Sequence, residues 1–141
     1  MLIIDPSLEY AGEPLEWLVV FDHGTSKPWF DRLVPGRFKH VSVAAYLDVP
    51  KVWLFYDIGW TGTKIKVLSA KSGEIYLGRY LVSGRKILRV PYSRAPTSWW
   101  TKVLGIWCVP AVKHLIRSRS GALLPDSLWR DLRAAGAQIF P

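Results

Sequence analysis

Residues 38–58 have the sequence FKHVSVAAYLDVPKVWLFYDI, which has the pattern of two strands joined by a turn. Residues 38–47 predict a strand, because their side chains alternate between two faces with a period of two. Residues 48–51, DVPK, predict a turn, and the β-branched and aromatic residues 52–58 predict a second strand. The short connection favours antiparallel pairing, so the stretch is expected to form a hairpin.

Alternation places two sets of side chains on opposite faces of the first strand. One face is expected to hold Phe38, His40, Ser42, Ala44 and Tyr46, and the other Lys39, Val41, Val43, Ala45 and Leu47. A hairpin centred on position 49 or 50 brings His40 opposite residues 58–60. Asp57 then lies within diagonal reach of His40, with allowance for a bulge.

Outward from this hairpin, the first two thirds of the chain are expected to be mostly sheet. Further strands are expected at residues 16–21, 64–69, 74–82 and 85–90, with a turn at 71–73 and one helical turn at 29–33. Residues 1–15 contain Pro6, Gly12 and Pro14 and are expected to form an irregular arm. Residues 16–141 then form a single domain.

The last third of the chain changes to helical patterns. A helix is expected to begin near Cys108 or Val109 and to reach about Arg117, because Pro110 is tolerated in a first turn. A second helix begins at Pro125 and ends before Gly136; its apolar face consists of Leu128, Trp129, Leu132 and Ala135. Residues 138–140 are expected to add a short edge strand. Strands followed by helices predict an α+β domain whose antiparallel sheet packs against the cysteine-bearing helix.

Composition limits the function classes. The chain has 141 residues, half of them hydrophobic, a net charge of +8 and one cysteine. One cysteine excludes an internal disulfide and a multi-cysteine metal site, and no P-loop, dinucleotide fingerprint or HExxH motif is found, so no cofactor or metal is expected. Residues 1–5 lack the features of a signal peptide, and the apolar run 103–112 is too short to span a bilayer. The expected location is cytoplasmic or virion-associated.

Cys108 is the candidate nucleophile. Free N–H groups and the positive end of the helix dipole stabilise a thiolate at the start of a helix. The alternative interpretation is that an unpaired cysteine serves as a small buried hydrophobe.

His40 is the candidate base, because a strand histidine can face a cysteine on a neighbouring helix. His114 follows Cys108 by six residues and falls on another helix face, and His23 lies in a turn. A catalytic histidine needs an orienting acceptor, for which Asp57 is the best candidate. Asp22 and Glu16 are substitutes, and Asp48 lies at the far end of the hairpin.

The order of these segments resembles the circularly permuted branch of the NlpC/P60 papain-like cysteine hydrolases, especially short phage-type members. The resemblance covers about residues 16–140 and rests on FKHVSV (38–43), CVPAVKHLI (108–116) and LPDSLWRDL (124–132). It implies a permuted papain-like arrangement with Cys108 as nucleophile, His40 as general base and Asp57 at the third, polar position. It also implies a peptide bond of the bacterial wall as substrate. Trp107 is a departure, because many relatives have a smaller or polar residue there.

Three functions follow as hypotheses. The first is a peptidase or amidase that forms a thioester through a Cys-His-Asp site, and the second is a non-enzymatic phage virion or tail component, with other virion proteins as partners. The third is a small nucleic-acid-binding domain, for which no motif is found; a loose basic run with two interleaved tyrosines is compatible with it, but such a run is more often a solvated face. Trp99, Trp100, Trp107 and Trp129 fit a substrate cleft or, more often, a core.

Overall fold

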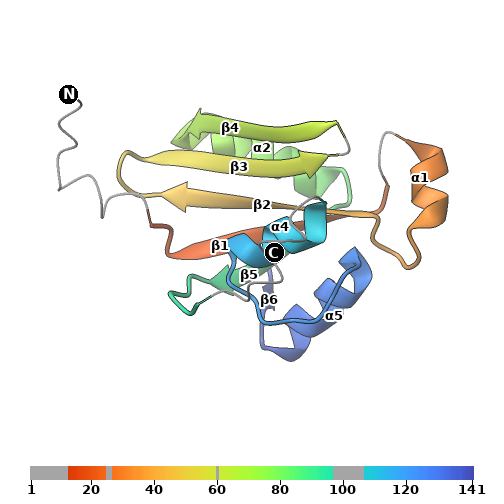
Figure 1. The fold of residues 1–141 in the computed structure, drawn as a ribbon. Helices are drawn as coiled ribbons and strands as arrows, with labels where there is room; N and C mark the ends of the chain where they lie inside the picture. The colour runs from red at the N-terminus through yellow and green to blue at the C-terminus, as the bar shows by residue number, and fades with distance from the viewer. Residues whose placement is uncertain (1–12, 25–26, 60, 97–106) are drawn as a thin grey trace, which may run out of the picture.

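A six-stranded antiparallel sheet forms the centre of the molecule, with strand order β4-β3-β2-β1-β5-β6 (Figure 1). The structure is a computed structural model that describes residues 13–24, 27–59, 61–96 and 107–141. The strands are β1 (Glu16–Asp22), β2 (His40–Leu47), β3 (Val52–Gly59), β4 (Gly62–Ser69), β5 (Lys86–Pro91) and β6 (Gln138–Ile139). The helices within the described ranges are α1 (Pro28–Leu33), α2 (Ala70–Val82), α4 (Cys108–Leu115) and α5 (Pro125–Ala134).

Helices cover both faces of the sheet, so two cores alternate along each central strand. In β1, Val19 and Phe21 belong to the core beneath α4 and α5, whereas Leu18 and Val20 belong to the core beneath α2. Figure 1 shows α4 and α5 on the near side of the sheet and α2 behind it. The α+β class is therefore confirmed, as is the packing of the cysteine-bearing helix on an antiparallel sheet, since α4 contacts β2 and β3.

The β2–β3 hairpin confirms the predicted register. Its ladder runs from Leu47↔Val52 to Val43↔Tyr56, which centres the hairpin between positions 49 and 50. Beyond Tyr56, β3 continues its pairing with β4 as far as Gly59↔Gly62. The hairpin is thus tightly paired at its turn and open at the end where His40 begins β2.

The strand predicted at residues 74–82 is wrong, and so is the turn predicted at 71–73. Both segments belong to α2, which begins after Ser69 because the Ser69 hydroxyl accepts a hydrogen bond from the Ser72 N–H. Gly73 and Leu77 are its buried residues and lie four apart, at helical spacing. The strand prediction weighed the β-branched and aromatic content of this segment and missed the capping serine.

The predicted face of Phe38 is also wrong. Phe38 precedes the first residue of β2 and packs in the α4 and α5 core together with Val41 and Val43. Strand alternation does not extend to it, because the strand begins only at His40.

The C-terminal elements agree closely with expectation. Helix α4 begins at Cys108, α5 begins at Pro125, and Gly136 follows α5 with a φ of +95°. Strand β6 forms the predicted edge strand at Gln138–Ile139. Of the predicted N-terminal arm, residues 1–12 lie outside the described residues. None of the helices in the described ranges combines the length and apolarity needed to cross a bilayer.

Candidate functional site

Cys108 is the first residue of α4 and is half-buried against the core. The preceding Trp107 has extended backbone angles, φ −137° and ψ 174°, so the chain turns into the helix at the cysteine itself. Pro110 has no N–H, and the first turn therefore presents the N–H groups of Cys108 and Val109. These groups and the helix dipole favour negative charge at the sulfur and on an oxygen beside it.

His40 and Asp57 form an ion pair at the open end of the β2–β3 hairpin. His40 Nε2 lies 2.6 Å from Asp57 Oδ1, and the two side chains are 21% and 40% exposed. Since the β2–β3 ladder has ended at Val43↔Tyr56, the two side chains take over the bridging between the strands. The structure thus brings together the candidate base and the candidate orienting acid that the sequence places diagonally.

Cys108 completes the group, because its side chain also interacts with that of His40. Burial disfavours a charged imidazole, but hydrogen bonds with Asp57 and Cys108 outweigh this effect. Together with the negative charges of both partners, they raise the pKa of His40 to about 10. His40 is therefore protonated at neutral pH, next to the Asp57 carboxylate.

Asp57 is held in its charged form by its surroundings. Burial acts to raise the pKa of Asp57, but the hydrogen bond with His40 and the charge of His40 lower it below its usual value of 3.8. The charges of Lys64 and Arg85 act in the same direction. Asp57 is therefore a carboxylate at neutral pH, where His40 is positively charged.

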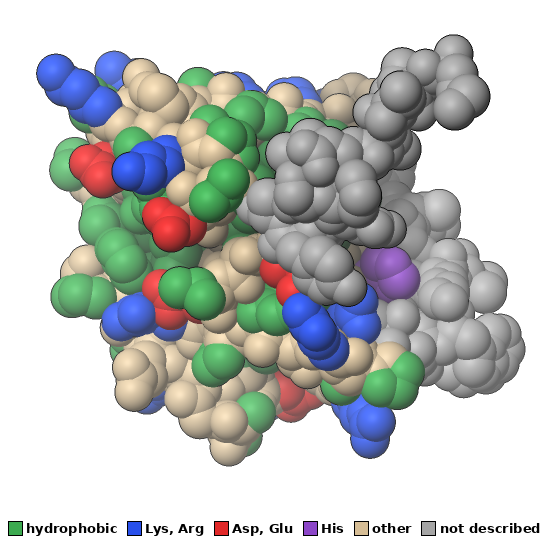
Figure 2. Space-filling view, turned by 90° about the vertical axis from the view of Figure 1, so that its left-hand side faces the viewer, with side chains coloured by type: hydrophobic (Ala, Val, Ile, Leu, Met, Phe, Trp, Pro, Cys, Tyr) green, Lys and Arg blue, Asp and Glu red, His purple; other side chains and the backbone are tan. Residues whose placement is uncertain are grey.

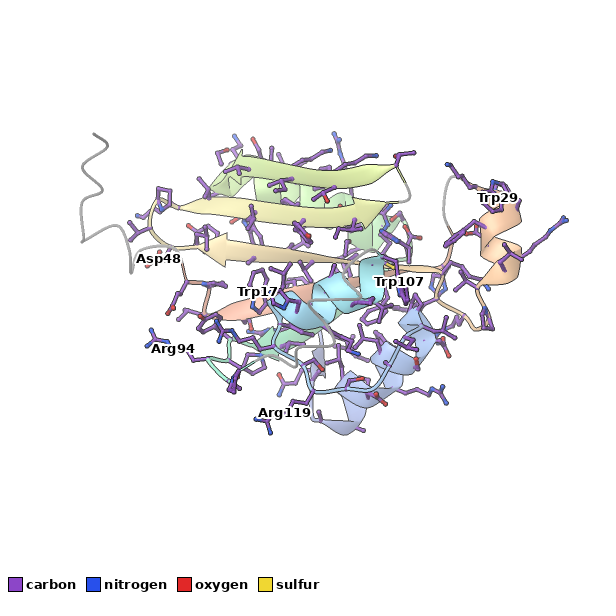
Figure 3. The ribbon with its side chains drawn as sticks, viewed as in Figure 1. Trp17, Trp29, Asp48, Arg94, Trp107 and Arg119 are labelled. Atoms are coloured by element: carbon purple, nitrogen blue, oxygen red, sulfur yellow. The ribbon has the colours of Figure 1, made fainter. Side chains whose placement is uncertain are left out.

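The alternative residues have other partners or other positions, although Asp22 lies opposite His40 in the β1–β2 ladder. His114 is exposed in the last turn of α4, and His23 is exposed with its ring 5.0 Å from that of Phe38. Asp22 accepts a 2.7 Å bond from Arg85, and Glu16 binds Arg89. Figure 3 shows Asp48 and Trp107 at opposite ends of the sheet, as expected.

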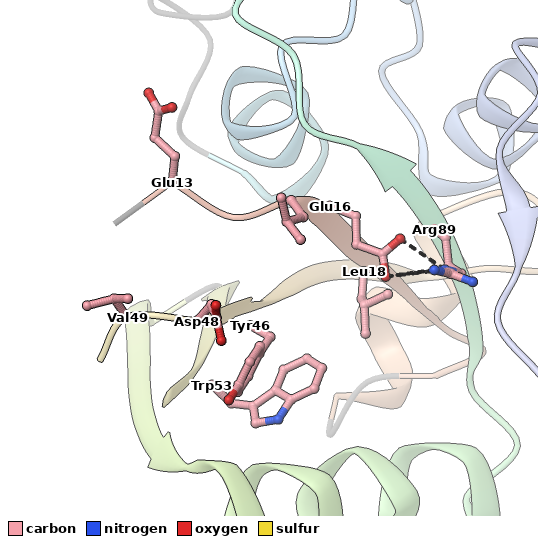
Figure 4. A pocket seen from close by; sticks show the side chains of 9 residues that line it. Glu13, Glu16, Leu18, Tyr46, Asp48, Val49, Trp53 and Arg89 are labelled. Atoms are coloured by element: carbon pink, nitrogen blue, oxygen red, sulfur yellow. Dashed lines mark hydrogen bonds and ion pairs between the residues drawn. The ribbon is translucent and has the colours of Figure 1, made fainter. Parts of the chain in front are cut away.

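A cavity of about 440 Å³ lies at the Asp48 end of the sheet, away from Cys108. Tyr46 and Trp53 form its aromatic wall, and the Glu16–Arg89 ion pair closes one side (Figure 4). The cavity is thus separate from the Cys108 group.

Two further residues lie against the flanks of the site: Trp107, for which the sequence left a substrate cleft or a core open, and Asp126, which sequence reasoning did not place in the site. The Trp107 indole N–H donates a 3.2 Å hydrogen bond to the Leu123 carbonyl, and the ring is 38% exposed. Asp126 Oδ1 accepts hydrogen bonds from the N–H groups of Arg37 and Phe38, just before His40. The sequence signal at Asp126 was only that of an acidic residue in a first helical turn.

The other sequence predictions for the site concern the tryptophans and a possible metal. Trp129 is half-buried and packs edge-on against Phe21 of the core at 5.1 Å, whereas Trp99 and Trp100 lie outside the described residues. Among the described residues, no group of three or more His, Cys, Asp or Glu side chains is arranged to hold a metal ion.

No family model, curated protein or solved structure matches the chain.

Proposed function

We propose that the chain is a cysteine hydrolase of the permuted NlpC/P60 papain-like type, which cleaves an amide bond. One observation supports this most strongly: the His40 side chain is paired with the Asp57 carboxylate at 2.6 Å and also interacts with Cys108, the first residue of a helix. This is the arrangement that an activated cysteine needs, namely a nucleophile, a proton donor and a group that orients the donor.

The reaction begins with attack of the Cys108 thiolate on the carbonyl carbon of the substrate. Negative charge then develops on the carbonyl oxygen, where N–H groups of the first turn of α4 can stabilise it. The His40 imidazolium gives its proton to the leaving nitrogen as the C–N bond breaks, which leaves a thioester on Cys108 and a neutral imidazole. His40 next takes a proton from water, the hydroxyl adds to the thioester, and the acid and the thiolate are released.

The substrate class proposed is a peptide of the bacterial wall. It rests on the resemblance of the Cys108 and His40 segments to the permuted NlpC/P60 branch, and the basic net charge of +8 suits an anionic polymer.

The test is hydrolysis of wall peptides and of a model thioester by the wild type and by Cys108→Ser. Serine at the first position of a helix preserves the backbone and nearly the side-chain volume, so the variant should remain folded and lose hydrolysis. His114→Asn is the matched control, because it removes the exposed histidine of the same helix and should keep full activity. Full activity in folded Cys108→Ser contradicts the proposal.

A wild type that is inactive on every wall peptide and thioester tested would favour the alternative of a virion or tail component, in which the thiol serves only packing. The nucleic-acid hypothesis has less support. Arg85, Arg89 and Arg94 each form an ion pair with an acidic residue, and on the face in Figure 2 positive and negative side chains are interspersed. Salt-sensitive retention on DNA would reverse this ranking.

A further inference from the structure

The segment from Ala122 to Asp126, which leads into α5, contacts the chain on both sides of the Cys108–His40 pair. On the cysteine side, the Leu123 carbonyl accepts the 3.2 Å hydrogen bond of Trp107, the residue before Cys108. On the histidine side, Asp126 Oδ1 accepts bonds of 3.1 Å from the Arg37 N–H and 3.4 Å from the Phe38 N–H. The segment from Ala122 to Asp126 thus bonds to the backbone of Phe38, two residues before His40. It also bonds to the side chain of Trp107, one residue before Cys108.

The contact on the histidine side fits closely. Gly36 has a φ of +96°, and a Cβ added to it would lie 2.7 Å from the Cβ of Asp126, so only glycine permits this approach. The Arg37 guanidinium lies 4.3 Å from the centroid of the Phe38 ring, and Phe38 packs on Trp129 of α5 at 5.0 Å. The residues that lead into β2 are therefore fixed against α5 by hydrogen bonds and by ring packing.

The segment itself is anchored to α4 and α5. Lys113 of α4 is buried and donates a 2.8 Å hydrogen bond to the Ala122 carbonyl. At the other end, the Leu124 N–H and the Ser127 hydroxyl bond to each other in the manner of a capping box, which fixes the first turn of α5. Because both ends of the segment are held, a displacement at the Trp107 contact should also displace the contact with Arg37 and Phe38, and the reverse.

We propose that this segment sets the separation between sulfur and imidazole, with Asp126 and Trp107 as positioning residues for His40 and Cys108. The inference rests on the proposed function, because a separation matters only if the two groups react as a pair. The rate of a reaction falls steeply when the reacting groups are misplaced by about 1 Å. A small displacement at either the Asp126 or the Trp107 contact should therefore reduce the reactivity of Cys108.

The test uses the single cysteine as its own probe. The rate of alkylation of Cys108 by iodoacetamide at pH 7 and the NMR titration of His40 are measured in the full chain. Asp126→Ala removes the acceptor and should slow alkylation roughly tenfold and move the His40 midpoint down toward its ordinary value. Asp126→Asn keeps an Oδ1 acceptor and should restore both readouts. Arg130→Ala is the control, since Arg130 is an exposed residue of the same helix.

Trp107→Phe extends the test to the cysteine side, because it keeps an aromatic ring and removes only the indole donor. It should slow alkylation several-fold, and it decides the question if Asp126→Ala does not fold. Wild-type alkylation and an unchanged His40 midpoint in folded Asp126→Ala, or unchanged alkylation in Trp107→Phe, overturn the proposal while leaving the catalytic pair intact. A wild type with an ordinary His40 midpoint and slow alkylation overturns both the pair and its positioning.

Discussion

The two ends of the β2–β3 hairpin differ in what joins the strands. At the turn, the ladder is complete through Leu47↔Val52, and the Tyr46 and Trp53 rings pack 5.4 Å apart. At the other end the ladder has stopped at Val43↔Tyr56, and the bridge is the ion pair of His40 and Asp57. Backbone hydrogen bonds and aromatic packing hold the turn end, whereas charged side chains hold the open end.

Substitutions at the two ends of the hairpin are therefore expected to affect different properties of the protein. Paired backbone and packed rings leave few groups available for reaction, so changes at the turn end should alter mainly the free energy of unfolding. Where the ladder stops, side chains are free to approach α4 and to exchange protons. Changes at the open end should therefore alter reactivity more than stability.

The largest expected effect is at the open end. His40→Ala and Cys108→Ala should each reduce kcat/KM for thioester hydrolysis by roughly 10³-fold or more. Because groups that act as one unit are not additive, the double variant should be little worse than either single one. Separate losses that multiply in the double variant would show that the two side chains act independently. Thermal melting of each variant serves as the control for folding.

The turn end should respond in stability instead. A Cβ at Gly73 would lie 2.3 Å from the ring of Trp53, so Gly73→Ala should lower the free energy of unfolding by about 1–3 kcal/mol. Gly78→Ala is the matched control in the same helix: with nothing within 4 Å of its Cβ, it should stabilise by roughly 0.5–1 kcal/mol. Both variants should alkylate Cys108 at the wild-type rate, and a slow rate in folded Gly73→Ala would show that the two ends are coupled.

The sequence predicted both ends of the hairpin because their determinants are local. Alternation, a four-residue turn and the position of Asp57 sufficed to bring that carboxylate to His40. The contacts of Asp126 could not be predicted in this way, since its partners Arg37 and Phe38 are 89 and 88 positions away and no local pattern connects them. Helix α2 was missed for another reason: strand propensity in residues 74–82 is overridden by the Ser69 cap and the packing of Gly73 and Leu77.

A third expected effect concerns the pH dependence of stability at the open end. The pKa of His40 is raised from 6.5 to about 10, so its contribution to stability is fully present below pH 6.5 and is lost as pH rises through about 10. Asp57→Asn removes one of the charges that raise this pKa and should flatten the loss between pH 7 and 10. It should also reduce activity less than His40→Ala, since both reacting groups remain. Urea unfolding at several pH values measures the first effect.

Asp48→Asn is the control for this pH dependence, because it makes the same change at an exposed position of the turn end. It should leave the slope between pH 7 and 10 as in the wild type. An equal slope in Asp57→Asn and wild type would mean that Asp57 does not contribute to the charge of His40.

The smallest expected effect tests how far the charge of the site extends across the sheet. Lys64 lies opposite Asp57 in the β3–β4 ladder, and its charge helps to lower the pKa of that carboxyl. Asp57 contributes stability above its ordinary pKa of 3.8, and this contribution is lost as pH falls through its lowered folded pKa. Lys64→Gln should therefore raise the pKa of Asp57 slightly and move the acid loss of stability to higher pH. The effect should be about 0.5 kcal/mol or less, because the lysine is exposed to solvent.

Lys64→Arg keeps the positive charge and should behave as the wild type, whereas Lys66→Gln removes a lysine of the same strand that bonds to Tyr76 instead. NMR titration of the Asp57 carboxyl measures the shift directly. If Lys64→Gln and Lys66→Gln move the Asp57 titration equally, the influence is the diffuse field of a basic protein. A shift in Lys64→Gln alone means that the pKa of Asp57 depends on the position of Lys64 directly opposite it in the β3–β4 ladder. The neighbouring strand β4 then helps to set the charge at the open end.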